Sequence, residues 1–505
     1  MVGRTKKSAN NVKVMIISKV INLFLSFISR TFFINYLGSE YLGVNGLFTN
    51  ILTILSFAEL GIGNAIIFKL YKPVAENNKE QIKTLMHFYK KIYIIIGCVV
   101  LGIGLCITPF INVLVNNNVE IKESIYILFL LFLLNTTVSY FCTYKRSIII
   151  ANQDEYITSI IELVINVLAN LTKILLLILT KNYILYLVST VLFTIVGNII
   201  ISIAANKKYQ YITEKEYNEI SKKEKRNIFN DVKSIILYKI GFVLSNGTDN
   251  IIISKALGVG QVGMLSNYTL ITTSINTLIS SAFNSLTGSI GNLNTINDRN
   301  KKEKVFYELL LLSFIIYGTI SSCLILLLNK FIHIWIGDTY VLSMLVPFAL
   351  GLNFYIDGMR FVNYTFRNTL GLFKKGRYAP LISSITNVIL SIVLVRIWGI
   401  FGVLIATAIT RLFILTLYDP YIIHKYEFKT SSIKFIKKYS IYMLIFFIST
   451  CICFYINKFI KIDGIIGFVV CGTIDVIINL LITLITTIKT EEFKSLKNRI
   501  INKEE

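Results

Sequence analysis

Apolar runs of about twenty residues follow one another along nearly the whole chain. Fourteen of them begin near positions 13, 42, 92, 124, 156, 183, 232, 264, 306, 341, 379, 400, 438 and 464. A helix needs about 20 mostly apolar residues to cross a hydrocarbon core of about 30 Å. The pattern therefore predicts an all-α polytopic membrane protein with about 14 transmembrane helices. Only Trp398 and Gly399 mark the boundary between the eleventh and twelfth runs.

The second apolar run carries a line of polar residues. We expect residues 42–68 to form one membrane-spanning helix, and its polar members recur at steps of three and four, which places them on one face. These members are Asn45, Thr49, Thr53, Ser56, Glu59 and Gly63. A carboxylate such as Glu59 costs about 2.5 to 3.5 kcal/mol at the centre of a span. This face should therefore meet a cavity or a partner charge instead of lipid.

Part of this region occurs twice in the chain. The sequence LGSEYLG at 37–43 is echoed by LGVGQVG at 257–263, an offset of 220 residues. Lys19 and Lys239 share that offset. Because internal repeats are common in secondary transporters, we predict two homologous six-helix lobes.

The repeat divides the chain into four parts. They are an N-terminal six-helix lobe at 1–205, a cytoplasmic connector at 206–231, a C-terminal six-helix lobe at 232–425, and two additional helices with a cytoplasmic tail at 426–505. The last two predicted helices lie outside the repeat and carry few charges, with Asp475 as the exception.

The distribution of basic residues along the chain indicates which loops face the cytoplasm. Of its 505 residues 54% are hydrophobic and only 16% are charged, which is too apolar for a soluble protein of this length. The net charge is +23, and most of the 51 lysines and arginines lie in the termini and in alternate loops. Cytoplasmic loops carry such an excess. We therefore expect both termini in the cytoplasm, contact with anionic membrane lipids, and no nucleic-acid partner.

Charged residues also lie inside several predicted spans. In the span near 341, Asp357 and Arg360 are three residues apart and could pair with each other. In the span near 156, Glu162 and Lys173 end a polar line on one face. The candidate cavity residues are Lys19, Arg30, Asn45, Glu59, Lys239, Asp249, Asp357, Arg360 and Arg411. Either these residues bind a substrate, or they form ion pairs that hold the helices together.

No group of residues suggests covalent or metal catalysis. The histidines His87, His333 and His424 lie in unrelated loops, and the seven cysteines lack a C-x-x-C spacing. No glycine-rich phosphate loop is found. We therefore expect no catalytic residue, no metal and no cofactor, and a transporter instead of an enzyme.

Several motifs resemble those of a known family. They are LGxxYLG at 37–43, ELGIG at 59–63, LYKP at 70–73, NGTDN at 246–250 and SNY at 266–268. They are similar to motifs of the polysaccharide flippases of Gram-positive bacteria, which belong to the multidrug, oligosaccharidyl-lipid and polysaccharide exporter superfamily. The resemblance runs over nearly the whole chain. It implies two six-helix lobes around a central cavity and alternating access in the bacterial cytoplasmic membrane. The implied activity is the export of a polyprenyl-diphosphate-linked saccharide for cell-surface polysaccharide of the O-antigen, capsule or teichoic type.

Such a substrate needs cations for its diphosphate and hydroxyls for its glycan. We expect the cytoplasmic group, Lys19, Lys239, Arg360 and Arg411, to receive the diphosphate and Arg30 to hold it during the switch. Moving a dianion outward is favoured by about 2.3 kcal/mol per charge per 100 mV. The membrane potential could therefore drive export, or a proton or sodium ion could couple at Glu59 or Asp357. Other polysaccharide-assembly proteins are expected partners.

Two other functions are compatible with the pattern. A cation-coupled multidrug exporter of the same superfamily would have a cavity dominated by acids, whereas these spans contain at least as many bases. A membrane saccharide polymerase or ligase would need a long external catalytic loop, and the predicted outside loops are short.

Overall fold

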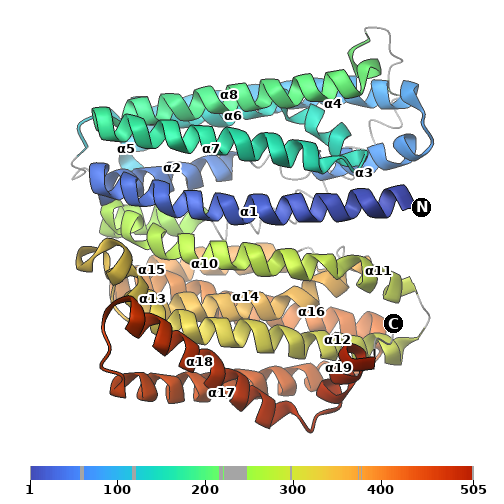
Figure 1. Cartoon of the computed structure of the whole chain (residues 1–505), viewed down its shortest axis with the longest axis vertical. Helices are drawn as coiled ribbons and strands as arrows, with labels where there is room; N and C mark the ends of the chain where they lie inside the picture. The colour runs from blue at the N-terminus through green and yellow to red at the C-terminus, as the bar shows by residue number, and fades with distance from the viewer. Residues whose placement is uncertain are drawn as a thin grey trace. The chain divides into compact units, whose positions relative to one another are not determined.

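The computed structural model describes residues 2–56, 62–115, 121–214, 220, 247–295, 298–372, 375–376 and 378–502. Throughout these residues the regular elements are helices, and no strand occurs among them (Figure 1). The chain divides into two compact units, Met1–Gly263 and Met264–Glu505. The prediction of an all-α polytopic membrane protein is confirmed. Two predicted cavity residues, Glu59 and Lys239, lie outside the described residues.

The helices of the first unit follow the apolar runs. They are α1 (Val2–Leu37), α2 (Ser39–Leu55), α3 (Ile62–Ala75), α4 (Lys79–Ile107), α5 (Ile111–Leu114), α6 (Ile125–Ala151), α7 (Glu155–Thr180) and α8 (Tyr183–Lys208), with short 3-10 turns η2 (Thr108–Phe110) and η3 (Gln210–Thr213). α7 packs against both α1 and α8, and α6 packs against α4 and α8. Figure 1 draws α6, α7 and α8 as neighbours.

The second unit continues the same pattern. Its helices are α10 (Val259–Ser285), which begins in the first unit, α11 (Thr287–Thr295), α12 (Arg299–Ser313), α13 (Thr319–Ile336), α14 (Leu345–Thr369), α15 (Ala379–Thr410), α16 (Thr416–Ile423), α17 (Ile433–Phe459), α18 (Gly464–Thr487) and α19 (Glu491–Asn502). A 3-10 turn, η5 (Asp338–Tyr340), and three π-helical turns, η4 (Phe314–Gly318), η7 (Arg411–Leu415) and η8 (His424–Phe428), complete it.

Eight of the described helical stretches are long and apolar enough to cross a membrane, or nine if the bent α6 counts as one span. The other predicted spans coincide with shorter or more polar helices, such as α2, with 17 residues, and α14, which carries Asp357, Arg360 and Arg367. Two predicted spans are incomplete, since residues 57–61 of the second and residues 221–246, where the seventh begins, lie outside the described part of the chain.

The prediction of one helix over residues 42–68 is wrong. α2 ends at Leu55, where Ser56 leaves the helical conformation with ψ 10°, and a separate helix, α3, begins at Ile62. The hydroxyls of Thr49 and Thr53 donate to backbone carbonyls one turn earlier, at 2.7 Å each. Such bonds offer the backbone an alternative partner and often bend helices. Both bonds lie in the last three turns of α2, just before the helix ends.

The break predicted near Trp398 is confirmed. Within α15, Gly399 adopts a left-handed conformation with φ 58°, which a residue with a side chain rarely takes. Three residues later, a Cβ atom on Gly402 would lie 2.1 Å from the Leu394 carbonyl oxygen. The two glycines therefore let α15 fold back tightly as two helices.

The two copies of the repeated motif pack on each other within the first unit. A Cβ atom added to Gly43 would lie 1.9 Å from the Val259 carbonyl oxygen, and one added to Gly263 would lie 2.0 Å from the Ser39 carbonyl oxygen. The offset of 220 residues maps the first contact onto the second. The glycines that precede the two helices also match, since Gly38 has φ 88° and Gly258 has φ 95°. The repeat is therefore structural.

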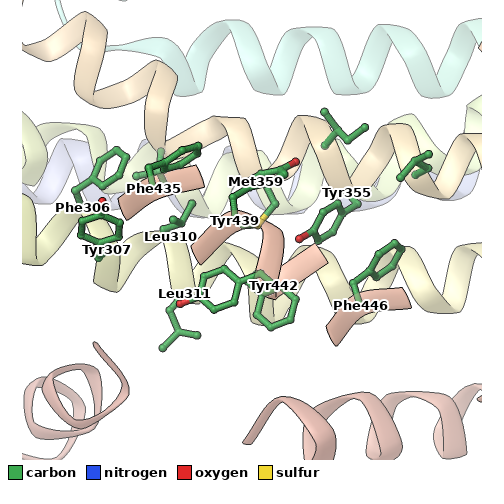
Figure 2. Close-up of a cluster of buried hydrophobic side chains, with 14 of the residues drawn as sticks. Phe306, Tyr307, Leu310, Leu311, Tyr355, Met359, Phe435, Tyr439, Tyr442 and Phe446 are labelled. Atoms are coloured by element: carbon green, nitrogen blue, oxygen red, sulfur yellow. The ribbon is translucent and has the colours of Figure 1, made fainter. Parts of the chain in front are cut away.

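Aromatic side chains fill the core of the second unit. Figure 2 shows Tyr355 and Met359 of α14 packed among residues of α12 and α17. Tyr355 stacks on Phe446 of α17 with ring centroids 4.5 Å apart, and Phe314 stacks on Tyr442 at 4.6 Å. Both Tyr355 and Met359 are fully buried. This packing fixes one face of α14 and leaves the face with Asp357 and Arg360 toward α15 and η7.

The two additional helices, α17 and α18, pack on α13 through buried polar groups. The Asn479 side chain of α18 donates to Ser322 of α13 at 3.1 Å and accepts from Ser449 of α17 at 2.8 Å. On the same helix, Asp475 is fully buried and accepts two hydrogen bonds from Asn457, at 3.1 and 3.0 Å. These helices are therefore integral to the second unit.

Hydrogen bonds and an ion pair tie the ends of α6, α7 and α8 together at the side that we predict to be cytoplasmic. The buried Asp154, between α6 and α7, accepts from the Tyr209 hydroxyl at 2.7 Å and pairs with Lys208 at 2.7 Å. Burial raises the pKa of Tyr209, and its hydrogen bond to Asp154 raises that pKa further. The neutral hydroxyl is thus maintained as a donor.

Candidate functional site

A cationic cluster in the second unit joins α14 to η7. Asp357 and Arg360 lie one turn apart on α14, and the Arg360 Nη1 atom lies 3.3 Å from Asp357 Oδ1. Arg411, the first residue of η7, bonds the other carboxylate oxygen of Asp357. The predicted pairing of Asp357 with Arg360 is confirmed, and the chain fold adds Arg411.

The charges of this cluster do not balance. Two guanidinium groups share one carboxylate, so the cluster of Asp357, Arg360 and Arg411 has a net charge of +1. The Asp357 side chain is 39% exposed, whereas Arg360 and Arg411 are 18% and 13% exposed. The buried Nε atom of Arg360 has no hydrogen-bond partner among the described residues. The Nε atom of Arg360 is therefore a charged hydrogen-bond donor that Asp357 does not use, and such a donor suits an anion.

A second cationic cluster lies in the first unit around Arg30 of α1. Arg30 is partly buried and lies near Tyr186 and Tyr183 of α8. The Tyr183 hydroxyl lies beside Asn45 of α2, and Phe33 packs edge-on against both tyrosine rings. Two predicted residues, Arg30 and Asn45, therefore approach one pair of tyrosines.

Of the remaining predicted residues, the structure describes Lys19 and Asp249. Lys19 lies on α1, 11 residues before Arg30, which is a rise of about 16 Å. Asp249 lies partly buried in helical residues 247–257. Glu59 and Lys239 lie outside the described part of the chain. Of the cytoplasmic group that we expected to receive the diphosphate, the structure therefore describes Lys19, Arg360 and Arg411.

Three tyrosines beside these polar groups were not among the predicted site residues. Tyr183 and Tyr186 are three residues apart and both face Arg30, while Tyr41 donates a 2.6 Å hydrogen bond to Glu123. Their spacing was visible, but nothing in the sequence distinguishes tyrosines that face a cation from the other tyrosines of the chain. Across the described residues, no group of three or more His, Cys, Asp or Glu could hold a metal ion.

A family model described as "Polysaccharide biosynthesis protein" matches residues 8–287, more than half of the chain. The chain belongs to this polysaccharide biosynthesis family. The match covers α1 to α10 and therefore both copies of the repeated motif and the Arg30 cluster. A search of curated proteins by sequence finds no match.

Solved structures share the fold of this polysaccharide biosynthesis protein. The lipid II flippase MurJ in an inward closed conformation is 16% identical, with 99% of this chain and 100% of that chain covered and a TM-score of 0.60. An inward-facing multidrug resistance MATE family transporter of the MOP superfamily is 15% identical, with 78% and 94% covered and a TM-score of 0.61. The Vibrio cholerae MATE transporter VcmN, as its D35N mutant, is 13% identical, with 81% and 95% covered and a TM-score of 0.57. Proteins named as a lipid II flippase and as multidrug transporters therefore share this fold. The fold alone does not indicate which of the two activities this chain has.

Proposed function

We propose that this protein flips a polyprenyl-diphosphate-linked oligosaccharide from the inner to the outer leaflet of the bacterial cytoplasmic membrane by alternating access. The observation that carries the proposal is the pair of guanidinium groups, Arg360 and Arg411, at one partly exposed carboxylate, with the buried Nε atom of Arg360 without a partner in the described part of the chain. Ionisable groups at membrane depth are costly, and by default they mark a substrate path. Arginine binds phosphate through two parallel hydrogen bonds, so the diphosphate is the part of the substrate that fits this cluster.

Family membership supports a substrate from polysaccharide assembly. Among proteins of this fold, MurJ is described as a flippase for a lipid-linked precursor and the MATE proteins as multidrug transporters. A carrier of cationic drugs would present an unpaired acid, whereas Asp357 is held by two arginines. The cluster therefore favours an anionic substrate, with multidrug export as the alternative. A polymerase or ligase is less well supported, because the fold is that of transporters.

The contact of Asp357 with two arginines also affects which driving force for export we propose. A proton or sodium ion coupled at Asp357 would have to compete with two guanidinium groups. Outward movement of an anion needs no such ion, because an inside-negative potential supplies about 2.3 kcal/mol per charge per 100 mV. We therefore propose that the membrane potential drives export.

The sidedness of the lipid-linked saccharide tests the function. Cells with and without the gene are treated with an added lectin or glycosidase that reaches only the outer leaflet. We expect the intermediate to accumulate in an inaccessible form when the gene is deleted, and to become accessible when the gene is restored. Equal accessibility in both strains, together with loss of resistance to cationic dyes in the deletion strain, would overturn the proposal in favour of drug export.

A further inference from the structure

A polar groove runs between α7 and α8 in the first unit. It has about 610 Å³ of empty space, and its polar lining comes from Glu162, Asn166 and Lys173 of α7 and from Thr190, Thr194 and Asn198 of α8. Phe193 and Ile165 add apolar surface. From Glu162 to Lys173 the groove follows α7 for about 16 Å, roughly half the thickness of a hydrocarbon core.

The groove faces away from the surface that these two helices offer to lipid. The exposed apolar side chains of α7 include Ile160, Val164, Leu168, Leu171 and Leu175, and those on α8 include Leu192, Val196, Ile199 and Ile203. The polar residues Asn166 and Asn198 each follow one of these apolar residues by two positions, which is about 200° around a helix. The polar lining therefore lies opposite the lipid-facing stripes.

The groups of the groove have more hydrogen-bond donors than the protein uses. Lys173 forms no ion pair with any described residue, and its Nζ atom lies 5.3 Å from the centre of the Tyr186 ring. The buried Nδ2 atom of Asn198 has no acceptor within the described structure. An unsatisfied buried donor costs about 1 to 3 kcal/mol, so a ligand rich in acceptor oxygens would be stabilised here.

Glu162, the acidic residue that lines the groove, is not the acceptor for Lys173 or Asn198. Glu162 is engaged by Arg146 of α6, whose Nη2 atom lies 3.4 Å from Glu162 Oε2. The hydroxyls of Thr190 and Thr194 donate to the carbonyls of Tyr186 and Thr190, at 3.0 and 2.9 Å, and therefore present only their oxygen lone pairs. Two free donors, two hydroxyl acceptors and one aromatic ring are the groups that recognise a sugar ring, which has hydroxyls on its edge and C–H groups on its faces.

We propose that the groove between α7 and α8 is a track that binds the saccharide portion of the lipid-linked substrate. This inference rests on the proposed function. Lys173 is at the end of the track that we predict to be nearer the outside. There it binds acceptor groups of the glycan, while Asn166 and Asn198 bind hydroxyls along its length.

The test measures the binding of two probes to the purified full-length protein in nanodiscs. One probe is a polyprenyl diphosphate that carries a disaccharide, and the other is the same polyprenyl diphosphate without sugar. For K173Q and N198L we expect the affinity for the sugar-bearing probe to fall about tenfold per lost hydrogen bond. The affinity for the sugar-free probe should change less than about twofold, which is within the uncertainty of such mutational effects.

Matched variants control the experiment. Asn170 is on α7, one turn after Asn166, and donates to the Asn166 carbonyl at 2.8 Å. It does not line the groove, so N170L should bind both probes like the wild type. N198Q retains the amide and should recover most of the affinity that N198L loses. Each variant is used only if its thermal unfolding curve matches that of the wild type, and N166L replaces N198L if N198L unfolds.

Each outcome has a separate meaning. If K173Q and N198L bind both probes more weakly by the same factor, the groove holds the diphosphate and the saccharide track is wrong. Wild-type protein that binds the two probes equally, with no effect of the variants, would also overturn the track while leaving the proposed function intact. Wild-type protein that binds neither probe would count against the proposed function itself.

Discussion

Arg367 of α14 and Asp419 of α16 form an ion pair of 2.5 Å in which the two side chains are only 1% and 2% exposed. Arg367 is two helical turns from Arg360 on the same helix. The two arginines differ in the acids that they contact. Asp357, which Arg360 shares with Arg411, is partly exposed, whereas Asp419, which Arg367 contacts, is buried. We therefore infer that Arg367 stabilises the fold, whereas Arg360 can contact a ligand.

Removing one member of the buried pair should destabilise the protein. We expect R367M and D419L each to lower the free energy of unfolding by about 3 to 5 kcal/mol, because each leaves an uncompensated buried charge. The double variant R367M/D419L should regain most of that loss. Thermal unfolding in detergent measures all three, and a double variant no more stable than either single variant would contradict the assignment.

Replacing the arginines that contact Asp357 should affect export and not stability. R360Q and R411Q each remove a charge-assisted donor, which is worth about 1.5 to 3 kcal/mol toward an anionic ligand. We therefore expect export to fall about tenfold or more at normal protein abundance. R396Q, at an exposed position of α15, is the control and should export normally. Normal export by R360Q and R411Q would show that the cluster only joins α14 to η7.

The repeated glycine contact predicts a strong effect of one added methyl group. In G43A the new Cβ atom would lie 1.9 Å from the Val259 carbonyl oxygen, so the two backbones have to move apart. We expect G43A to lower the free energy of unfolding by about 1 to 3 kcal/mol, as overpacking does, measured by thermal unfolding in detergent. G102A is the control, because a Cβ atom at Gly102 meets nothing within 4 Å, and it should unfold like the wild type. Wild-type unfolding of G43A would contradict the close contact.

The C-terminal helix α19 should detach when one buried acid is neutralised. Glu308 of α12 is 2% exposed and accepts from Arg499 Nε at 3.1 Å and from the Ser495 hydroxyl at 2.6 Å. We expect E308Q to speed proteolysis of residues 491–502 several-fold under native conditions, with little change in the unfolding temperature. E491Q, at an exposed position on α19, should be cleaved at the wild-type rate. Unchanged cleavage of E308Q would mean that other contacts hold the helix.

Hydrophobic periodicity predicted most of the fold because a bilayer imposes a single length scale on every helix. The starts of the spans, the break at Gly399 and the repeat were all visible in the sequence. The end of α2 at Leu55 was not, because apolar residues continue beyond it and hydropathy does not detect a change of backbone conformation.

The candidate site was predictable only where its residues are neighbours in sequence. Asp357 and Arg360 are three apart on one helix, so their pairing followed from spacing. Arg411 is 54 residues from Asp357 and reaches it only because α14, α15 and η7 pack together. The groove between α7 and α8 likewise depends on how two helices pack. A line of polar residues on α7 could be recognised, but its partner residues on α8 could not.

The reciprocal packing of Gly43 on Val259 and of Gly263 on Ser39 has the geometry of a two-fold axis within one polypeptide. Such a contact is what two identical half-length proteins would make when they associate as a homodimer. In a homodimer one substitution would alter both sides of such an interface at once. A single chain encodes the two sides separately, and here serine stands at 39 and valine at the matching position 259, while both glycines are the same.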